Sequence, residues 1–138
     1  MGIVKRVDRV AFAVGDLDAA REFFGNVLGA DFGPVQDVEA FKFRCQPFEL
    51  GSYRMELVAP YDATSPLSHF LMKHSQGFHH LTCEVEDIHE AVKALEQRGI
   101  EVTSRKHHDD EGIPKEEVFI EPRHAFGVLI QLVQTDKT

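Results

Sequence analysis

Two segments of this chain match each other along their whole length without a gap. The segment "RVAFAVGDLDAAREFF" at 9–24 aligns with "HLTCEVEDIHEAVKAL" at 80–95. In each copy an alternating stretch is followed by an Asp that can cap a helix, and then by apolar residues at helical spacing. Each copy ends at a Gly, as helix C-termini commonly do. The sequence therefore predicts a duplicated module that begins with a strand and a helix.

The ends of the two half-chains also resemble each other, as "RMELVAP" at 54–60 and "LIQLVQ" at 129–134. We therefore expect two tandem modules, each strand–helix–strand–strand–strand (βαβββ), within a single domain at 1–138. Module 1 is expected at about 6–60 and module 2 at about 78–134, joined by a connection at 61–77.

The patterns of alternation and helical spacing predict an α+β fold with mostly antiparallel strands. The expected strands are 7–14, 30–36, 39–46, 52–59, 78–85, 100–106, 116–121 and 127–134, and the expected helices are 16–28, 66–74 and 87–98. Eight strands with ordinary twist tend to curl, so we expect one curled, eight-stranded mixed sheet.

Side chains alternate between the faces of a strand, so each expected strand has an apolar face for the helices and a more polar opposite face. In a curled sheet the polar face lines a pocket rather than a flat wet surface. The repeat pairs Arg9 with His80 and Glu56 with Gln131. The side chains predicted to line the pocket are those of Arg9, Lys42, Arg44, Arg54, Glu56, His80, Glu84, Glu117, Phe119 and Gln131. His79 is expected to point to the opposite face from His80.

The composition limits the possible partners. The 138 residues carry a formal net charge of −8, which disfavours binding to nucleic acid or to an anionic membrane. No signal-peptide pattern and no apolar run of membrane-spanning length is present, so we expect a cytoplasmic protein. Cys45 and Cys83 fit buried free thiols of a reducing compartment.

Three segments carry a family resemblance: "VDRVAFAVGDLDAAREFFGNVLGA", "GFHHLTCEVEDIHEAVKALEQRGI" and "GVLIQLVQ". They resemble the vicinal oxygen chelate (VOC) superfamily, which includes glyoxalases, bleomycin-resistance proteins and dioxygenases, and within it the glyoxalase and methylmalonyl-CoA epimerase branch. The resemblance implies paired βαβββ modules that form a cup. It also implies a divalent metal held by one residue from each of four strands, which binds vicinal substrate oxygens and stabilises an enolate.

The four ligand positions of that branch fall on Arg9, Glu56, His80 and Gln131 in this sequence. Glu56 and His80 match the pattern, whereas Arg9 replaces a His and Gln131 replaces a Glu. Arg has no lone pair for a metal and carries a permanent positive charge. The interpretations are a four-ligand metal site, a weaker site of Glu56, His80 and Gln131, or a metal-free site with an Arg9–Glu56 ion pair, and the sequence favours the last.

The resemblance implies an isomerase or lyase that transfers a proton next to a carbonyl, on a small carboxylic or keto acid or an acyl thioester. Arg9, with Lys42 or Arg44, would bind a carboxylate or enolate oxygen, and Phe119 and Gln131 would contact substrate. Glu56 or His80 would be the general base or acid. No nucleotide cofactor is expected. The chain is expected to form a homodimer.

The alternative function is metal-independent binding of a small molecule, as in bleomycin-resistance proteins. An extradiol-type dioxygenase is disfavoured, because the ligands of its iron are replaced at Arg9 and Gln131. His107 and His108 are expected in a solvated loop after the strand at 100–106. The resemblance implies that this loop closes over substrate, which makes either histidine a candidate acid or base.

Overall fold

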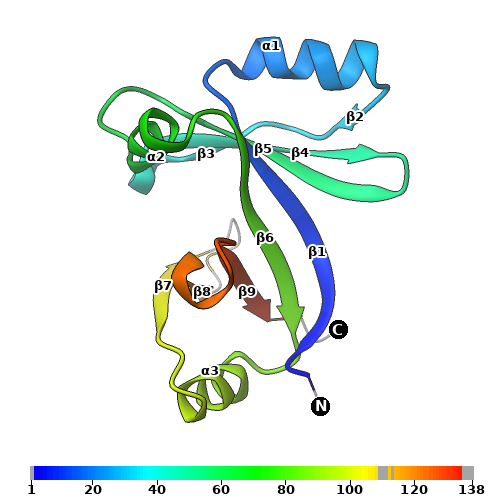
Figure 1. The fold of residues 1–138 in the computed structure, drawn as a ribbon. Coiled ribbons are helices and arrows are strands. Elements are labelled where there is room, and N and C mark those ends of the chain that lie inside the picture. Colours follow the sequence, from blue (N-terminus) through cyan, green and yellow to red (C-terminus); the bar gives the residue numbers. More distant parts are fainter. Residues whose placement is uncertain (1, 109–111, 113, 135–138) are drawn as a thin grey trace. The chain divides into compact units, whose positions relative to one another are not determined.

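The computed structural model describes residues 2–108, 112 and 114–134. The chain divides into two compact units (Figure 1). We call Arg9–His79 the module 1 unit, and Met1–Asp8 with His80–Thr138 the module 2 unit. The chain passes between the units within two strands, β1 (Val4–Ala13) and β6 (Gly77–Val85).

In the module 1 unit, the strands follow the order β2-β4-β5-β1, and β3 pairs with β4. The last strand, β5, runs parallel to β1 and antiparallel to β4. The elements after β1 are α1 (Leu17–Arg21), which continues as the π-helical turn η1 (Glu22–Val27), β2 (Asp31–Phe32), β3 (Gln36–Val38), the 3₁₀ turn η2 (Glu39–Phe41), β4 (Phe43–Leu50), β5 (Tyr53–Pro60) and α2 (Pro66–His74).

The module 2 unit repeats this topology, because its strand order is β7-β8-β9-β6 with β9 parallel to β6 and antiparallel to β8. Its elements after β6 are α3 (Ile88–Gln97), β7 (Val102–His108), β8 (Pro114–Ile120), the 3₁₀ turn η3 (Pro122–His124) and β9 (Ile130–Gln134). The predicted α+β class with two βαβββ modules is confirmed.

The strand register places the two copies in the same frame. Ala11 of β1 lies opposite Glu56 of β5, and Thr82 of β6 lies opposite Gln131 of β9. Thr82 is the repeat partner of Ala11, so Glu56 and Gln131 occupy equivalent positions in their modules, as the sequence predicted.

The helices begin where their capping residues predict. The side chains of Asp16 and Asp87 accept hydrogen bonds from the first backbone N–H groups of α1 and α3. Ser65 caps α2 in the same way, and Pro66 occupies its first turn, where a missing N–H costs nothing. The helix expected at 66–74 in the connection is therefore confirmed, and it belongs to the module 1 unit.

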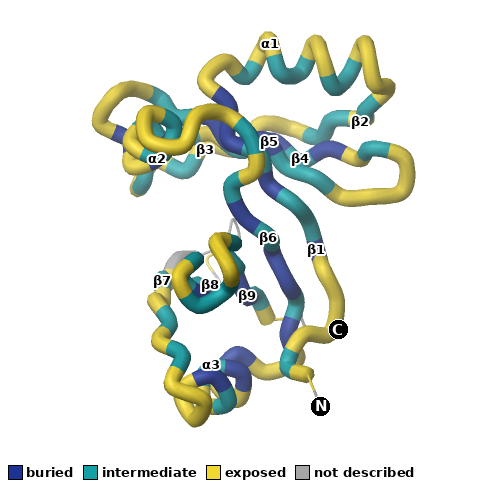
Figure 2. The backbone as a smooth tube through the Cα atoms, viewed as in Figure 1, coloured by how far each residue is buried: buried dark blue, intermediate teal, exposed yellow. Residues whose placement is uncertain are grey.

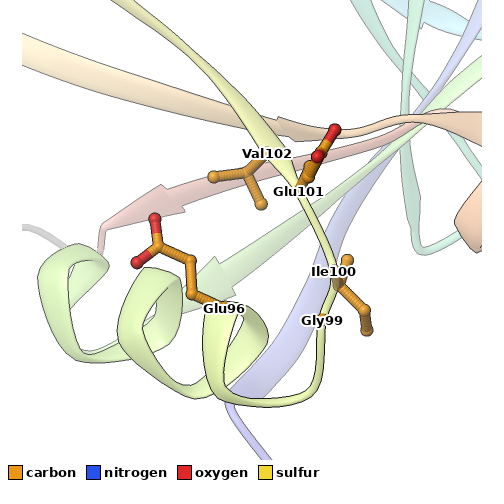
Figure 3. A pocket seen from close by; sticks show the side chains of 5 residues that line it. All are labelled: Glu96, Gly99, Ile100, Glu101 and Val102. Carbon is orange, nitrogen blue, oxygen red and sulfur yellow. The ribbon is translucent and has the colours of Figure 1, made fainter.

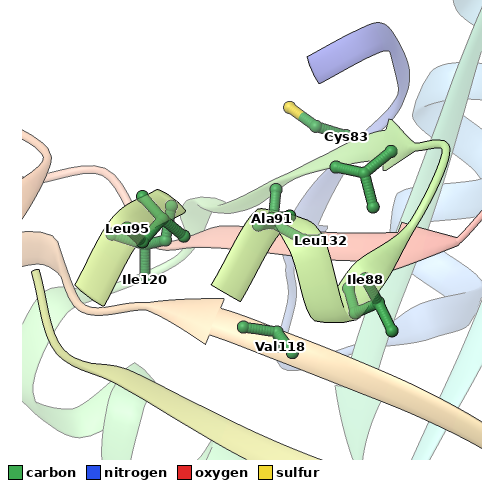
Figure 4. Close-up of a cluster of buried hydrophobic side chains, with 8 residues drawn as sticks. Cys83, Ile88, Ala91, Leu95, Val118, Ile120 and Leu132 are labelled. Atoms are coloured by element: carbon green, nitrogen blue, oxygen red, sulfur yellow. The ribbon is translucent and has the colours of Figure 1, made fainter. Parts of the chain in front are cut away.

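The core of the module 2 unit lies between α3 and one face of its strands (Figure 4). Ile88, Ala91 and Leu95 of the helix pack against a strand layer made of Cys83, Val85, Val118, Ile120 and Leu132. The opposite face carries His80, Thr82 and Glu84 of β6, Glu117 and Phe119 of β8, and Gln131 of β9, in accordance with the alternation of strand side chains. We call this the polar face of the module 2 unit.

Both faces of the strands in the module 1 unit are covered by helices. Phe48, Leu57 and Ala59 pack on the α1 side, together with partly buried residues such as Phe24. The other face holds a second cluster, in which Ala13 and Val58 pack against Leu67 of α2. Figure 2 shows buried stretches on α3 but none on α1, so the two copies of the helix differ in burial.

Several predicted details are wrong. The strand expected at 39–46 begins only at Phe43, after a 3₁₀ turn, and the strand expected at 127–134 begins at Ile130. The structure also divides the expected 30–36 strand region into the short strands β2 and β3, so nine strands are present in the described residues. His107 and His108 lie in β7, opposite Lys115 and Pro114, rather than in a loop. None of the helices in the described residues is long and apolar enough to cross a membrane.

Candidate functional site

A close ion pair joins β1 and β5 in the module 1 unit. The Nε atom of Arg9 donates to Oε2 of Glu56 at 2.6 Å, and the two side chains are only 24% and 13% exposed. Arg9 precedes Ala11 by two residues, and Ala11 lies opposite Glu56, so both charged side chains emerge on the same face of neighbouring strands. The ion pair that the sequence suggested in place of a metal is therefore present.

A buried hydrogen bond marks the corresponding place in the module 2 unit. The Oγ1 atom of Thr82 donates to Oε1 of Gln131 at 2.8 Å, and these two residues are 0% and 4% exposed. His80, two residues before Thr82, is 8% exposed. The bond to Thr82 fixes the amide of Gln131, so that its oxygen already serves as an acceptor within the protein.

Phe119 lies directly opposite Gln131, on the polar face, as predicted. One strand further along the sheet, Arg105 of β7 lies opposite Glu117. The guanidinium of Arg105 bonds the Glu117 carboxylate, with its Nε donating at 2.8 Å, and stands over the Phe119 ring at 5.3 Å from the ring centroid. Sequence reasoning missed Arg105. Glu117 was among the expected pocket residues, and Arg105 is the residue opposite it across the β7–β8 hairpin, so cross-strand pairing could have found it.

A third Arg–Glu pair stands at the edge of the polar face. Arg6 holds Glu84 through two hydrogen bonds, at 2.7 and 3.0 Å. The bonded guanidinium lowers the pKa of the Glu84 carboxyl below its ordinary value. Glu56, Glu84 and Glu117 are thus each paired with an arginine from another strand.

Lys42 and Arg44 lie elsewhere than predicted. Arg44 is opposite Ala59, on the α1 side, whereas Glu56 is opposite Pro47, on the other face. Arg44 pairs with Asp37 at 3.5 Å and covers the ring of Tyr61. Lys42 is the cap of η2, in a left-handed backbone conformation (φ 54°), and its Nζ donates to Thr64 at 3.0 Å. The expectation that Arg44 shares a face with Glu56 is wrong, because the apolar side chains Phe43 and Cys45 point toward α2 instead.

His79 points away from the polar face, as expected, and packs in the module 1 unit. Its ring meets the ring of Phe70 edge to face, with centroids 4.6 Å apart. Burial disfavours the charged imidazolium and lowers the pKa of His79 from 6.5 to about 4.

The depressed pKa of His79 predicts a stability loss in acid. The unfolded chain takes up this proton below about pH 6.5, and the folded chain only near pH 4, so the stabilisation is complete above pH 6.5 and is lost as the pH falls to 4. We expect a loss of up to about 3 kcal/mol, which His79→Phe should largely remove. Urea unfolding of both proteins between pH 7 and 4 measures it, with His69→Gln, at an exposed position of α2, as the control. Parallel pH curves for the wild type and His79→Phe would contradict the assignment.

A hollow of about 420 Å³ lies where α3 ends and β7 begins (Figure 3). It is lined by Glu96, Gly99, Ile100, Glu101 and Val102, none of which was predicted as a site residue. Its two carboxylates disfavour an acidic substrate, so it is not a candidate for the chemistry expected of this chain.

The residues present do not fit a four-ligand divalent metal. The Arg9 guanidinium is hydrogen-bonded to the Glu56 carboxylate, and its fixed charge would repel a cation bound there. The amide oxygen of Gln131 accepts from Thr82. In the parts of the chain that the structure describes, no group of three or more His, Cys, Asp or Glu side chains is arranged to hold a metal ion.

The family model of the Glyoxalase/Bleomycin resistance protein/Dioxygenase superfamily matches residues 8–114, which is most of the chain. The chain belongs to this superfamily. It is 36% identical over 131 residues to the mitochondrial methylmalonyl-CoA epimerase of Bos taurus, covering 94% of this chain and 74% of that protein. It is 33% identical over 133 residues to the ethylmalonyl-CoA/methylmalonyl-CoA epimerase of Cereibacter sphaeroides, covering 96% and 99%.

The fold agrees with this membership. The crystal structure of methylmalonyl-CoA epimerase from Mycobacterium tuberculosis superposes with a TM-score of 0.84 at 27% identity, covering 99% of this chain and 92% of that one. The predicted superfamily and fold class are confirmed, and the relatives are named as epimerases, a class of isomerase that the resemblance implied.

Proposed function

We propose that this superfamily member is an epimerase that inverts the α-carbon of a 2-alkylmalonyl-CoA thioester. The observation that carries the proposal is the ion pair of Arg9 and Glu56, which sets a fixed cation beside a carboxylate on the face of β1 and β5 that lies opposite α1. Relatives at 33–36% identity are named as epimerases of methylmalonyl-CoA. Proton transfer next to a carbonyl is a reaction that such a pair can support.

The reaction requires stabilisation of negative charge. A base removes the α-proton, and the electron pair of the C–H bond moves onto the thioester oxygen to form an enolate. A preorganised cation lowers the energy of that oxyanion. Arg9 has the permanent charge and the planar set of N–H donors for this role.

Inversion also requires two proton carriers, since the proton leaves one face of the α-carbon and a proton returns to the other. Glu56 and His80 are the predicted acid–base residues, since a carboxylate and an imidazole can each accept and donate a proton. We assign one of the two transfers to each residue. In the reverse reaction they exchange roles, and after each turnover both residues return to their starting protonation states by proton exchange with water.

Hydrogen exchange in heavy water tests the function. The protein should catalyse both deuterium incorporation at the α-carbon of methylmalonyl-CoA and interconversion of the two stereoisomers, followed by NMR and by chiral chromatography of the hydrolysed acids. Absence of exchange with methylmalonyl-CoA and ethylmalonyl-CoA, with tight binding of another small molecule, would replace the proposal with sequestration. The expected homodimer and cytoplasmic location stay predictions.

We further propose that the reaction needs no divalent metal, because Arg9 supplies the cation. Activity should then survive dialysis against EDTA. The variant Arg9→His should gain Co²⁺ binding, since it removes the fixed positive charge beside the Glu56 carboxylate and adds an imidazole on the neighbouring strand. The visible absorption of Co²⁺ reports its binding whether or not the variant is active. Stoichiometric metal in the wild type that disappears in His80→Ala would contradict the proposal.

A further inference from the structure

Arg105 is a cation on the polar face of the module 2 unit for which the predicted chemistry gives no role. Its carboxylate partner Glu117 lies on the neighbouring strand β8, directly opposite it. The guanidinium extends along the face as far as the ring of Phe119, 5.3 Å from the ring centroid. Phe119 lies opposite Gln131, whose side chain accepts the buried hydrogen bond from Thr82. The positive charge of Arg105 therefore lies against a residue that neighbours this hydrogen bond.

Two contacts hold this guanidinium in place. Glu117 binds its Nε and a terminal nitrogen, and Phe119 supports its plane by a cation–π contact. The side chains of Arg105 and Glu117 are 29% and 14% exposed, so the pair is partly shielded from water. Preorganised in this way, a guanidinium loses little side-chain entropy when it binds an anion.

We propose that Arg105 recognises the free carboxylate of the acyl group. The inference rests on the proposed function, because a 2-alkylmalonyl thioester carries one carboxylate besides the thioester carbonyl at which the enolate forms. Arg is the residue best suited to bind a carboxylate through two parallel N–H donors. Arg105 would thereby distinguish 2-alkylmalonyl thioesters from simple acyl thioesters, which lack the carboxylate.

A purely structural cross-strand pair is the competing explanation, and the chain contains one for comparison. Arg123 of η3 bonds Glu101 at 2.9 Å, but these side chains are 65% and 79% exposed. Exposed pairs of that kind contribute little to stability and select no ligand. The Arg105 pair differs because it is shielded and because its guanidinium is stacked on an aromatic side chain of the polar face.

Ligand discrimination tests the inference. Calorimetric titration compares methylmalonyl-CoA, used as the equilibrated mixture of stereoisomers, with propionyl-CoA, which lacks the carboxylate. We expect the wild type to prefer methylmalonyl-CoA, and Arg105→Met to weaken that binding about tenfold or more while propionyl-CoA binds as before. Glu117→Gln keeps the guanidinium but loses the carboxylate that holds it, so this variant should weaken the preference less than Arg105→Met does, and Arg123→Met is the matched control.

The possible outcomes separate this inference from the proposed function. If Arg105→Met keeps the preference for methylmalonyl-CoA, or weakens the binding of both thioesters equally, Arg105 is not the carboxylate-recognition residue. Exchange activity of the wild type would still support the epimerase function in that case. If the wild type binds neither thioester, both the proposed function and the inference are wrong. Thermal unfolding of Arg105→Met identifies a variant that fails to fold, and Arg105→Lys, which retains a cation, should then recover part of the preference.

Discussion

Arg9→Met is expected to lower α-hydrogen exchange by about 10³-fold, the loss typical when an oxyanion loses its principal stabilising donor. The side chain removed is the fixed cation beside Glu56, and methionine fills a similar volume without charge. Arg9→Lys should keep part of the activity, because an ammonium retains the charge but not the planar arrangement of donors. Rates of deuterium incorporation into methylmalonyl-CoA measure both effects.

Folding must be separated from chemistry in this test. Arg9→Met leaves the Glu56 carboxylate, only 13% exposed, without its bonded guanidinium, and we expect a destabilisation of about 1–3 kcal/mol. The double variant Arg9→Met/Glu56→Gln should regain that stability and remain inactive. Arg21→Met, in an ion pair on α1, is the matched control. Wild-type exchange by a folded Arg9→Met protein would refute the role of Arg9.

His80→Gln is expected to lower the rate of inversion by about 10²- to 10⁴-fold, the usual contribution of a general acid–base group. The same variant should still exchange the α-hydrogen of one stereoisomer, because Glu56 remains to remove and return that proton on one side. Exchange without inversion distinguishes a lost proton carrier from a general loss of activity. Separate NMR assays of the two stereoisomers measure this difference.

The control for this variant is His89→Gln on α3, where the side chain is 82% exposed. Because His80 is 8% exposed, its replacement also requires a thermal unfolding curve. Equal loss of exchange for both stereoisomers would show that His80 serves both directions and that the assignment of one transfer to each residue is wrong. Unchanged inversion would exclude His80 altogether.

The duplicated architecture was predictable because it rests on local signals that each copy repeats. Asp16 and Asp87 cap equivalent helices, and the alternating stretch before each Asp fixes the strand frame. This strand frame predicted that the side chains of Arg9 and Glu56 lie together, because side chains on the same face of adjacent strands meet. The ion pair was therefore within reach of sequence reasoning.

The face of β4 was not predictable from alternation alone. Phe43 and Cys45 on one face and Phe48 on the other are all apolar, so the pattern does not indicate which face is covered. The unforeseen factor was the position of α2, which buries the second face and leaves Arg44 on the α1 side. Arg105 was within reach of the sequence, because the strand expected at 100–106 includes it and the structure pairs it with Glu117, which was itself expected in the pocket.

The equivalence of Ala11–Glu56 and Thr82–Gln131 in strand register also bears on the history of the site. A protein assembled from two identical copies of one module would carry the same residue twice at each place, either two arginines or two histidines. Joining the copies in one chain lets each position change independently, so one copy can carry His80 while the other carries Arg9. A single polypeptide can therefore combine a permanent cation and an imidazole at positions that a symmetric assembly would be obliged to make alike.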